Sequence, residues 1–343
     1  MDLQEETMNI GVIGGGSWGT ALARLLATKG PDVTIWVYEP ELVDEINDNH
    51  ENTMYLPDVE LPANLRATND FAEALGDADM ILSVPPSHVL RDVMTHARDH
   101  IPEGVPIVSA TKGIENDTRM LVSEILEDVL APRYHPFLAY LSGPSFAREV
   151  AEEKPTAVTI ASYNHNLAVE MQHLFSTDFF RCYSSNDVIG VEIGGALKNV
   201  IAIASGAVSG MELGLNASAG MITRGLHEIT KIAVKKGANP LTLTGLAGMG
   251  DLVLTCTGGL SRNRTVGTKI GQGMTVDEIL EDMNMVAEGI KTSKSVYQLA
   301  DELDVEMPIS EQVYLVLHQD KDIYQAVDDL MARDLKPERG GWA

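Results

Sequence analysis

Cysteine is rare in this sequence. The chain of 343 residues has two, Cys182 and Cys256, which lie far apart and match no metal-binding or redox spacing. We therefore expect two free thiols and no disulfide framework. The sequence also has no HExxH motif, no cysteine cluster and no Walker phosphate loop, and its nine histidines are scattered. Metal catalysis and phosphoryl transfer thus find no support, and we expect no metal cofactor.

Basic residues are also few. Lysine and arginine total 25 against 50 aspartates and glutamates, which gives a formal net charge of -25. Nucleic acids need a basic binding surface, so we expect no nucleic-acid partner. A small phosphorylated ligand would be repelled at long range, so its binding requires basic residues that gather locally around it. The opening residues, "MDLQEET", show no secretion signal, which favours a cytoplasmic protein.

The pattern of the sequence changes near residue 187. Before it, six short aliphatic or β-branched runs alternate with helical patterns, which predicts an α/β fold with a largely parallel sheet. After it, the strand signal disappears and apolar residues follow a helical period. Because the chain is long for a single core, we expect two domains, an α/β domain at 1–187 and an all-α domain at 188–343. The six runs begin at Met8, Val33, Asp79, Pro106, Phe137 and Thr156.

The run from Val188 to Met211 is almost wholly small and apolar, interrupted by Glu192, Lys198 and Asn199. Its length suits a membrane span, but these polar side chains are costly in hydrocarbon, so we expect a helix buried in protein. Lysine is rarely buried without a partner or a task. Lys198 is therefore a candidate functional residue; the alternative is a lysine whose charge reaches solvent from a buried helix.

A glycine-rich turn follows the first predicted strand. Gly14, Gly16 and Gly19 have the GxGxxG spacing between a strand and an Ala/Leu-rich helix, where glycines allow a tight turn and close approach to a pyrophosphate. This predicts that residues 1–187 bind a dinucleotide. Glu39 comes 20 residues after Gly19, at the end of the next strand, where a carboxylate can hold a ribose 2′-hydroxyl and favours NAD over NADP. A structural turn and a solvated carboxylate are the alternatives.

Small or polar residues follow five of the predicted strands. Because ligands bind beyond the carboxyl ends of parallel strands, we expect these loops to line one crevice. Lys112 follows the strand that begins at Pro106, and Ser142 and Ser145 follow the next one, where hydroxyls can donate to an oxyanion. The alternatives are an exposed lysine that aids solubility and a simple strand-to-helix connection.

The helical half contains one dense polar and glycine-rich segment, "GLAGMGDLVLTCTGGLSRNRTVGTKIGQG". In a chain so poor in basic residues, its guanidinium and amide groups favour phosphate binding over an ordinary charged loop. The residues concerned are Asp251, Thr255, Ser261, Arg262, Asn263 and Arg264.

Several segments together resemble one family: "GGGSWGTALA", "LPDV", "VPPSHV", "ATKGIE", "SGPSFA", "DVIGVEIGGALKNVIAIASG", "ITRGLHE", "GLAGMGDLVLTCTGGLSRNR" and "VAEG". In this order and spacing, the chain resembles bacterial NAD(P)-dependent glycerol-3-phosphate dehydrogenase over nearly its full length. The resemblance implies a Rossmann-type domain followed by a 6-phosphogluconate-dehydrogenase-like helical domain. It also implies reversible NAD(P)H-dependent reduction of dihydroxyacetone phosphate to sn-glycerol 3-phosphate, which supplies glycerophospholipid synthesis, and a homodimer.

The resemblance further implies roles for individual residues. Lys198 falls on the catalytic lysine, a general acid in reduction and a base in oxidation. Lys112, Asn199 and Asp251 fall on its polar active-site neighbours. Residues expected to contact the cofactor are Gly14, Gly16, Ser17, Trp18, Gly19, Tyr38, Glu39, Lys112, Ala147, Arg262, Val286 and Glu288. Residues expected to contact the substrate are Lys112, Gly143, Ser145, Lys198, Asp251, Thr255, Ser261, Arg262 and Asn263.

Tyr38 departs from the family pattern, in which a histidine or arginine is common, so the choice between NAD and NADP stays open. Two other classes of protein stay open as well. One is another dehydrogenase with the same two-domain plan, such as a hydroxy-acid or ketopantoate type, but this alternative leaves the "SRNR" and "TKG" segments unexplained. A non-catalytic nicotinamide sensor would not need Lys112, Lys198 or Asp251.

Overall fold

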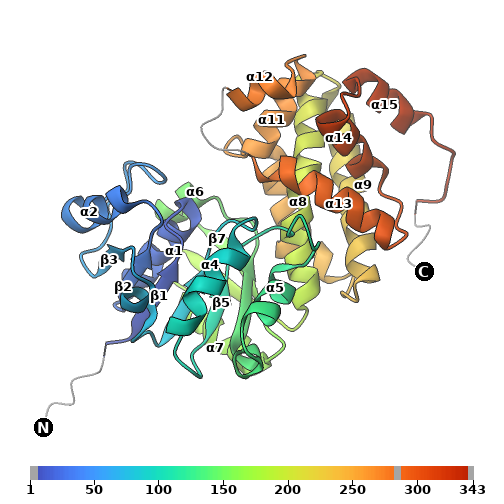
Figure 1. Cartoon of the computed structure of the whole chain (residues 1–343). Coiled ribbons are helices and arrows are strands. Elements are labelled where there is room, and N and C mark those ends of the chain that lie inside the picture. Colours follow the sequence, from blue (N-terminus) through green and yellow to red (C-terminus); the bar gives the residue numbers. More distant parts are fainter. Residues whose placement is uncertain (1–6, 282–286, 339–343) are drawn as a thin grey trace, which may run out of the picture. The chain divides into compact units, whose positions relative to one another are not determined.

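Eight strands form one sheet in the N-terminal part of the chain (Figure 1). They are β1 (Asn9–Ile13), β2 (Asp32–Trp36), β3 (Leu65–Thr68), β4 (Met80–Ser83), β5 (Ile107–Ser109), β6 (Leu138–Ser142), β7 (Thr156–Ala161) and β8 (Phe180–Ser185). Their order is β3-β2-β1-β4-β5-β6-β7-β8. Strands β1 to β6 run parallel, β7 runs antiparallel to β6, and β8 runs parallel to β7. The loops after β1, β2, β4, β5 and β6 therefore meet at one edge of the sheet.

Each of the six predicted runs contains a strand, and the largely parallel α/β sheet is confirmed. Strands β3 and β8, which are the two edge strands, were not predicted from the sequence. Each carries an exposed arginine, Arg66 in β3 and Arg181 in β8. An edge strand needs less apolar surface than a central one, so its apolar run is interrupted and its signal is weak.

The computed structural model describes residues 7–281 and 287–338. The chain forms two compact units, residues 1–112 with 122–188 and residues 113–121 with 189–343. In the first unit, helices connect the strands and cover a large apolar core. They are α1 (Ser17–Ala27), α2 (Pro40–Asn49), α3 (Phe71–Leu75), α4 (Leu90–Ala97), α5 (Val122–Val129), α6 (Ala147–Ala151) and α7 (His165–Phe175), with short 3-10 helices η1 (Arg98–His100) and η2 (Pro132–Phe137).

Within its described residues, the second unit is helical, as predicted. Its elements are α8 (Val188–Gly210), α9 (Gly214–Lys235), the short η3 (Thr242–Thr244) and η4 (Leu246–Gly250), α10 (Asp251–Thr257), α11 (Arg262–Gly271), α12 (Val276–Glu281), α13 (Glu288–Glu302), α14 (Pro308–His318) and α15 (Ile323–Met331). The segment 113–121 belongs to this unit because Ile114 and Leu121 are buried in its core. In addition, Ser295 Oγ donates a hydrogen bond to Asn116 Oδ1 at 2.5 Å.

Helix α8 is the central helix of this unit (Figure 1). Among the described residues it alone is long and apolar enough to pass for a membrane span, yet 83% of its most apolar window is buried inside the protein. A Cβ added at Gly206 would lie 2.1 Å from Arg264 O, and one at Gly267 would lie 1.9 Å from Ile203 O. The backbones of α8 and α11 thus touch, so the small residues of α8 serve helix packing in a protein core.

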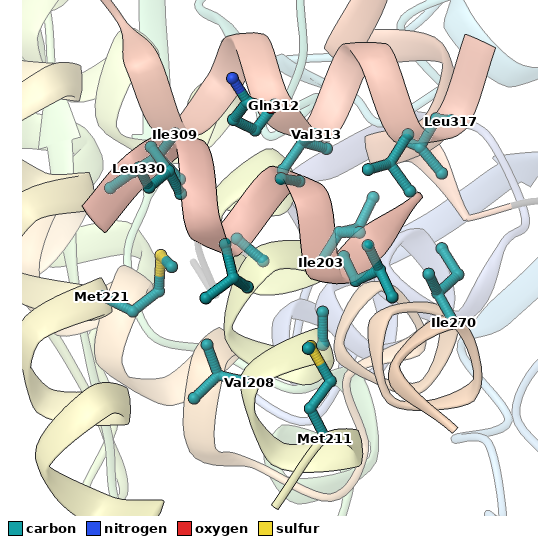
Figure 2. Close-up of a pocket in the computed structure, with 16 residues that line it drawn as sticks. Ile203, Val208, Met211, Met221, Ile270, Ile309, Gln312, Val313, Leu317 and Leu330 are labelled. Carbon is teal, nitrogen blue, oxygen red and sulfur yellow. The ribbon is translucent and has the colours of Figure 1, made fainter. Parts of the chain in front are cut away.

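Figure 2 shows an apolar pocket inside the helical unit, formed by α8, α9, α11, α14 and α15. Its empty volume is about 480 Å³, part of which is open to solvent. Gln312 is the one polar side chain in its described lining, which includes Ile203, Met221, Val313 and Leu317. A lining without a titratable group cannot transfer protons, so the chemistry of this chain must be sought elsewhere.

Candidate active site

The buried lysine of α8 has a partner. Lys198 Nζ lies 2.5 Å from Asp251 Oδ1, and the two side chains are 11% and 1% exposed. A buried charge requires such a partner, because an unpaired ammonium or carboxylate in the interior is strongly disfavoured. The pair thus places one ammonium group, with a fixed orientation, at a position that is shielded from bulk water.

The approach of Asp251 to α8 depends on Gly194. Residues Gly194 and Lys198 are four apart, so they lie on the same face of α8. A Cβ at Gly194 would be 2.3 Å from Ala247 O, in the π-helical turn η4 that leads directly into α10. Only glycine lets this turn come so close, and Asp251, the first residue of α10, then reaches Lys198.

Asn199, the next residue of α8, is also buried. The first turn of α13 packs against it: a Cβ at Gly289 would lie 2.8 Å from Asn199 O. Gly289 N donates to Asn263 Oδ1 at 2.9 Å, so Asn263 joins α11 to the start of α13. Glu288 is the first residue of α13, close to this junction. The predicted cofactor contact Val286 lies outside the described residues.

Helix α10 and the start of α11 contain further predicted substrate contacts. Ser261 is buried and caps the helix, since its Oγ accepts a hydrogen bond from Arg264 N at 3.2 Å. Arg262 is exposed at the first helical position. Thr255, in α10, is buried and donates to Asp251 O at 2.6 Å. The helical unit thus buries all five of Lys198, Asn199, Asp251, Thr255 and Asn263. Lys198 and Thr255 are both bonded to Asp251, Asn263 is bonded to the start of α13, and Arg262 lies at the first position of α11.

The glycine-rich turn of the first unit has the geometry of a pyrophosphate site. Gly14 has φ +112°, and a Cβ at Gly19 would lie 1.9 Å from Gly14 O, so neither position tolerates a side chain. Gly16 faces open space, with nothing within 4 Å of its added Cβ. Trp18 Nε1 is buried and has no hydrogen-bond partner among the described residues. A turn open at Gly16 and a buried donor without an acceptor fit a bound dinucleotide.

The loops after β4, β5 and β6 are linked to one another. Thr111 Oγ1 donates to Pro85 O at 2.7 Å. Lys112 Nζ donates to Gly143 O at 3.0 Å, and Ser145 Oγ donates to the same carbonyl at 2.9 Å. Ala147 begins α6 directly after this turn. The predicted gathering of Lys112, Gly143 and Ser145 at one edge of the sheet is therefore present within this unit.

At the end of β2, Tyr38 and Glu39 differ in environment. The Tyr38 side chain is 78% exposed, whereas Glu39 Oε1 accepts a hydrogen bond from the Tyr55 hydroxyl at 2.7 Å. Tyr55 was not predicted from the sequence, and neither was the nearby Asn52, whose Nδ2 donates to Gly15 O at 2.9 Å. Neither belongs to a periodic pattern, because both lie in an irregular segment after α2. No group of three or more potential metal ligands occurs in residues 7–281 and 287–338.

Comparison with known proteins identifies the family. Residues 9–168 match the N-terminal part, and residues 187–328 the C-terminal part, of NAD-dependent glycerol-3-phosphate dehydrogenase. The chain belongs to this family. The predicted family and the predicted fold class are both confirmed.

Individual relatives are similar over almost their whole length. Glycerol-3-phosphate dehydrogenase [NAD(P)+] of Citrifermentans bemidjiense is 57% identical over 96% of this chain and 98% of its own length. The protein of the same name from Leptospira biflexa is 54% identical over 96% and 99%. The crystal structure of glycerol-3-phosphate dehydrogenase from Coxiella burnetii has a TM-score of 0.89 and 40% identity, and covers 95% of this chain and 99% of that one.

Proposed function

We propose that this chain catalyses the reversible reduction of dihydroxyacetone phosphate to sn-glycerol 3-phosphate with NADH or NADPH, and that Lys198 is the proton donor. The family and its relatives support the reaction and the oxidoreductase class. The observation that most supports the residue role is the buried ion pair of Lys198 and Asp251. It supplies an oriented ammonium group within the apolar, buried helix α8.

The chemistry needs one proton at one oxygen. When bound, the reduced nicotinamide supplies a hydride to the C2 carbonyl carbon of the substrate. Negative charge then develops on the carbonyl oxygen, and the Lys198 ammonium stabilises it and donates a proton, which yields the alcohol. Asp251 orients the ammonium throughout. In the reverse direction, the neutral Lys198 amine accepts the proton of the C2 hydroxyl.

The phosphate of the substrate needs a cationic site in this acidic chain. Arg262 is exposed at the first position of α11, where free backbone N–H groups and the helix dipole also favour an anion. We assign the phosphate to this helix start, with Ser261 and Asn263 beside it. The buried Asn199 is assigned to the active site as a neighbour of Lys198, and the buried Thr255 to the substrate. Lys112, Gly143 and Ser145 are assigned to the substrate from the loops of the first unit.

The cofactor is assigned to the glycine-rich turn. Gly14, Gly16, Ser17, Trp18 and Gly19 would hold its pyrophosphate, at the N-terminus of α1. Tyr38 and Glu39 would face the adenosine side, and Ala147 and Glu288, with Lys112 and Arg262, are assigned to the nicotinamide side. On this basis residues 1–187 form the dinucleotide-binding domain and residues 188–343 the helical catalytic domain. The family resemblance further supports a cytoplasmic location and a homodimer, and light scattering of the purified chain tests the dimer.

The phosphate assignment is tested by comparing Arg262→Ala with wild type on two substrates, following the absorbance of the reduced nicotinamide. Loss of a charged hydrogen bond should raise KM for dihydroxyacetone phosphate about tenfold or more. With the reduced nicotinamide at saturating concentration, so that loss of the cofactor contact of Arg262 is compensated, KM for unphosphorylated dihydroxyacetone should change much less. The matched control is Arg98→Ala, which removes an arginine from the 3-10 helix η1 of the first unit. Equal losses on both substrates would contradict the phosphate role of Arg262, and no turnover by wild type would contradict the proposed reaction.

A further inference from the structure

A tyrosine outside the glycine-rich motif holds the acidic residue at the end of β2. The hydroxyl of Tyr55 donates to Glu39 Oε1 at 2.7 Å. Oε2 of the same carboxylate accepts no hydrogen bond from any residue that the structure describes, so one oxygen is fixed and the other is available to a ligand. Glu39 precedes α2 directly, in the position where a dinucleotide-binding fold uses an acidic side chain to bind ribose.

The segment that contains Tyr55 is itself tied to the glycine-rich turn. Asn52 Nδ2 donates to Gly15 O and to Thr20 Oγ1, both at 2.9 Å. Ser17 Oγ donates to Tyr55 O at 2.5 Å, and Tyr55 N donates to Asn52 Oδ1 at 3.1 Å. These hydrogen bonds join the turn, the Tyr55 segment and the end of β2 into one network. The position of the Tyr55 hydroxyl, and with it that of the Glu39 carboxylate, is therefore set by the turn that would bind the pyrophosphate.

Tyr55 remains a hydrogen-bond donor at neutral pH. Its hydrogen bond to the Glu39 carboxylate, together with partial burial and the charges of Glu39 and Glu41, raises the pKa of Tyr55 to about 12. Deprotonation would place a third negative charge beside two carboxylates. The phenol thus donates to Glu39 over the whole pH range in which enzymes of this kind work.

The electrostatics of this corner disfavour a phosphate. Glu39 and Glu41 both act on Tyr55. No lysine or arginine of residues 7–281 or 287–338 forms an ion pair with Glu39 or a hydrogen bond to Tyr55. A 2′-phosphate placed here would meet carboxylates, whereas a 2′-hydroxyl would find an acceptor in Glu39.

We propose that Tyr55 is a positioning residue for cofactor selection: it holds the Glu39 carboxylate where it accepts a hydrogen bond from the 2′-hydroxyl of the adenosine ribose, and so makes the chain prefer NAD(H) to NADP(H). This inference rests on the proposed function, since it places the cofactor at the glycine-rich turn. It adds a residue that does not lie in the GxGxxG motif, and it commits the chain to one of the two nicotinamide cofactors.

The test measures dissociation constants for NAD+ and NADP+ by calorimetry, without substrate, in Tyr55→Phe, Glu39→Gln, the double variant and wild type. Wild type should bind NAD+ more tightly. Tyr55→Phe keeps the ring and removes only the hydroxyl, and it should lower the NAD+ preference about tenfold, the usual effect of losing a hydrogen bond to a charged group. In the Glu39→Gln background, the same change should have no further effect on the preference, because Tyr55 acts through Glu39. The control Tyr324→Phe, at an exposed tyrosine of α15, should leave both constants unchanged.

Three results would overturn the inference: a wild type without NAD+ preference, a Tyr55→Phe variant that weakens both dinucleotides equally, or a Tyr55→Phe effect of the same size in the Glu39→Gln background. A wild type that binds neither dinucleotide would instead contradict the proposed function itself. The ratio of kcat/KM for NADH and NADPH with dihydroxyacetone phosphate should shift by the same factor as the ratio of dissociation constants.

Discussion

The ion pair of Lys198 and Asp251 leads to a stability prediction that is separate from its role in catalysis. Its side chains are 11% and 1% exposed, so removing one partner leaves the other as a buried, uncompensated charge. Such a loss costs about 3–5 kcal/mol of the free energy of unfolding. We therefore expect both Lys198→Met and Asp251→Leu to be destabilised by about that amount, although each new side chain is apolar and of similar volume.

The double variant should behave in the opposite way. With both charges replaced, no buried charge is left unpaired, and well-packed apolar side chains often equal or exceed a buried ion pair in stability. We expect Lys198→Met/Asp251→Leu to unfold within about 1 kcal/mol of wild type, or to be more stable, and to be inactive.

The assay is urea unfolding followed by far-ultraviolet circular dichroism, which reports on the helices of both units. A coupling energy of several kcal/mol between the two sites is the expected result. Single variants that unfold like wild type would refute the burial of the pair. A double variant as unstable as the sum of the two singles would refute their direct interaction.

Two further predictions concern glycine and glutamate residues of the helical unit. Gly194→Ala places a Cβ 2.3 Å from Ala247 O, so it should destabilise the chain by about 1–3 kcal/mol and lower kcat by displacing Asp251. The control is Gly220→Ala, whose added Cβ has no atom within 4 Å and which should be neutral or stabilising. Equal behaviour of the two alanine variants would contradict the close approach. Glu228 is 3% exposed and accepts hydrogen bonds from Ile309 N and from Ser310 N and Oγ, and burial raises its pKa from 4.5 to about 7. Between these pH values Glu228 is ionised in the unfolded chain but keeps its proton in the folded one. The free energy of unfolding of wild type should therefore fall by about 3 kcal/mol relative to that of Glu228→Gln as pH rises through this window. Parallel curves of unfolding free energy against pH for the two proteins would contradict the buried neutral carboxyl.

The sequence predicts much of the fold because central strands and the glycine-rich turn have strong local signals. The edge strands β3 and β8 escape prediction because exposed arginines interrupt their apolar runs. Helix α8 is buried, as predicted. The ammonium group of Lys198 can lie in its buried surroundings because the Asp251 carboxylate pairs with it. Sequence reasoning named Asp251 as a neighbour but could not derive the contact, because it joins residues 53 positions apart through the packing of η4 on α8.

Two features of the candidate site depend on tertiary structure in the same way. Ser261 was expected to contact substrate, and the structure shows that its hydroxyl also caps α11, a local role that its position before a helix indicates. Tyr55 reaches Glu39 from a segment without periodicity, so neither spacing nor composition indicates the contact. Where a site depends on hydrogen bonds between irregular segments, only the folded chain reveals it.

The most direct test of the account is the turnover of Lys198→Ala with dihydroxyacetone phosphate and NADH. Loss of a general acid should lower kcat by about 10²- to 10⁴-fold, while the dissociation constant for NADH stays at the wild-type value, because Lys198 is not among the residues assigned to the cofactor. Added primary amines should restore part of the rate, since they supply the missing ammonium. An unchanged kcat would contradict the assignment of Lys198 as the proton donor.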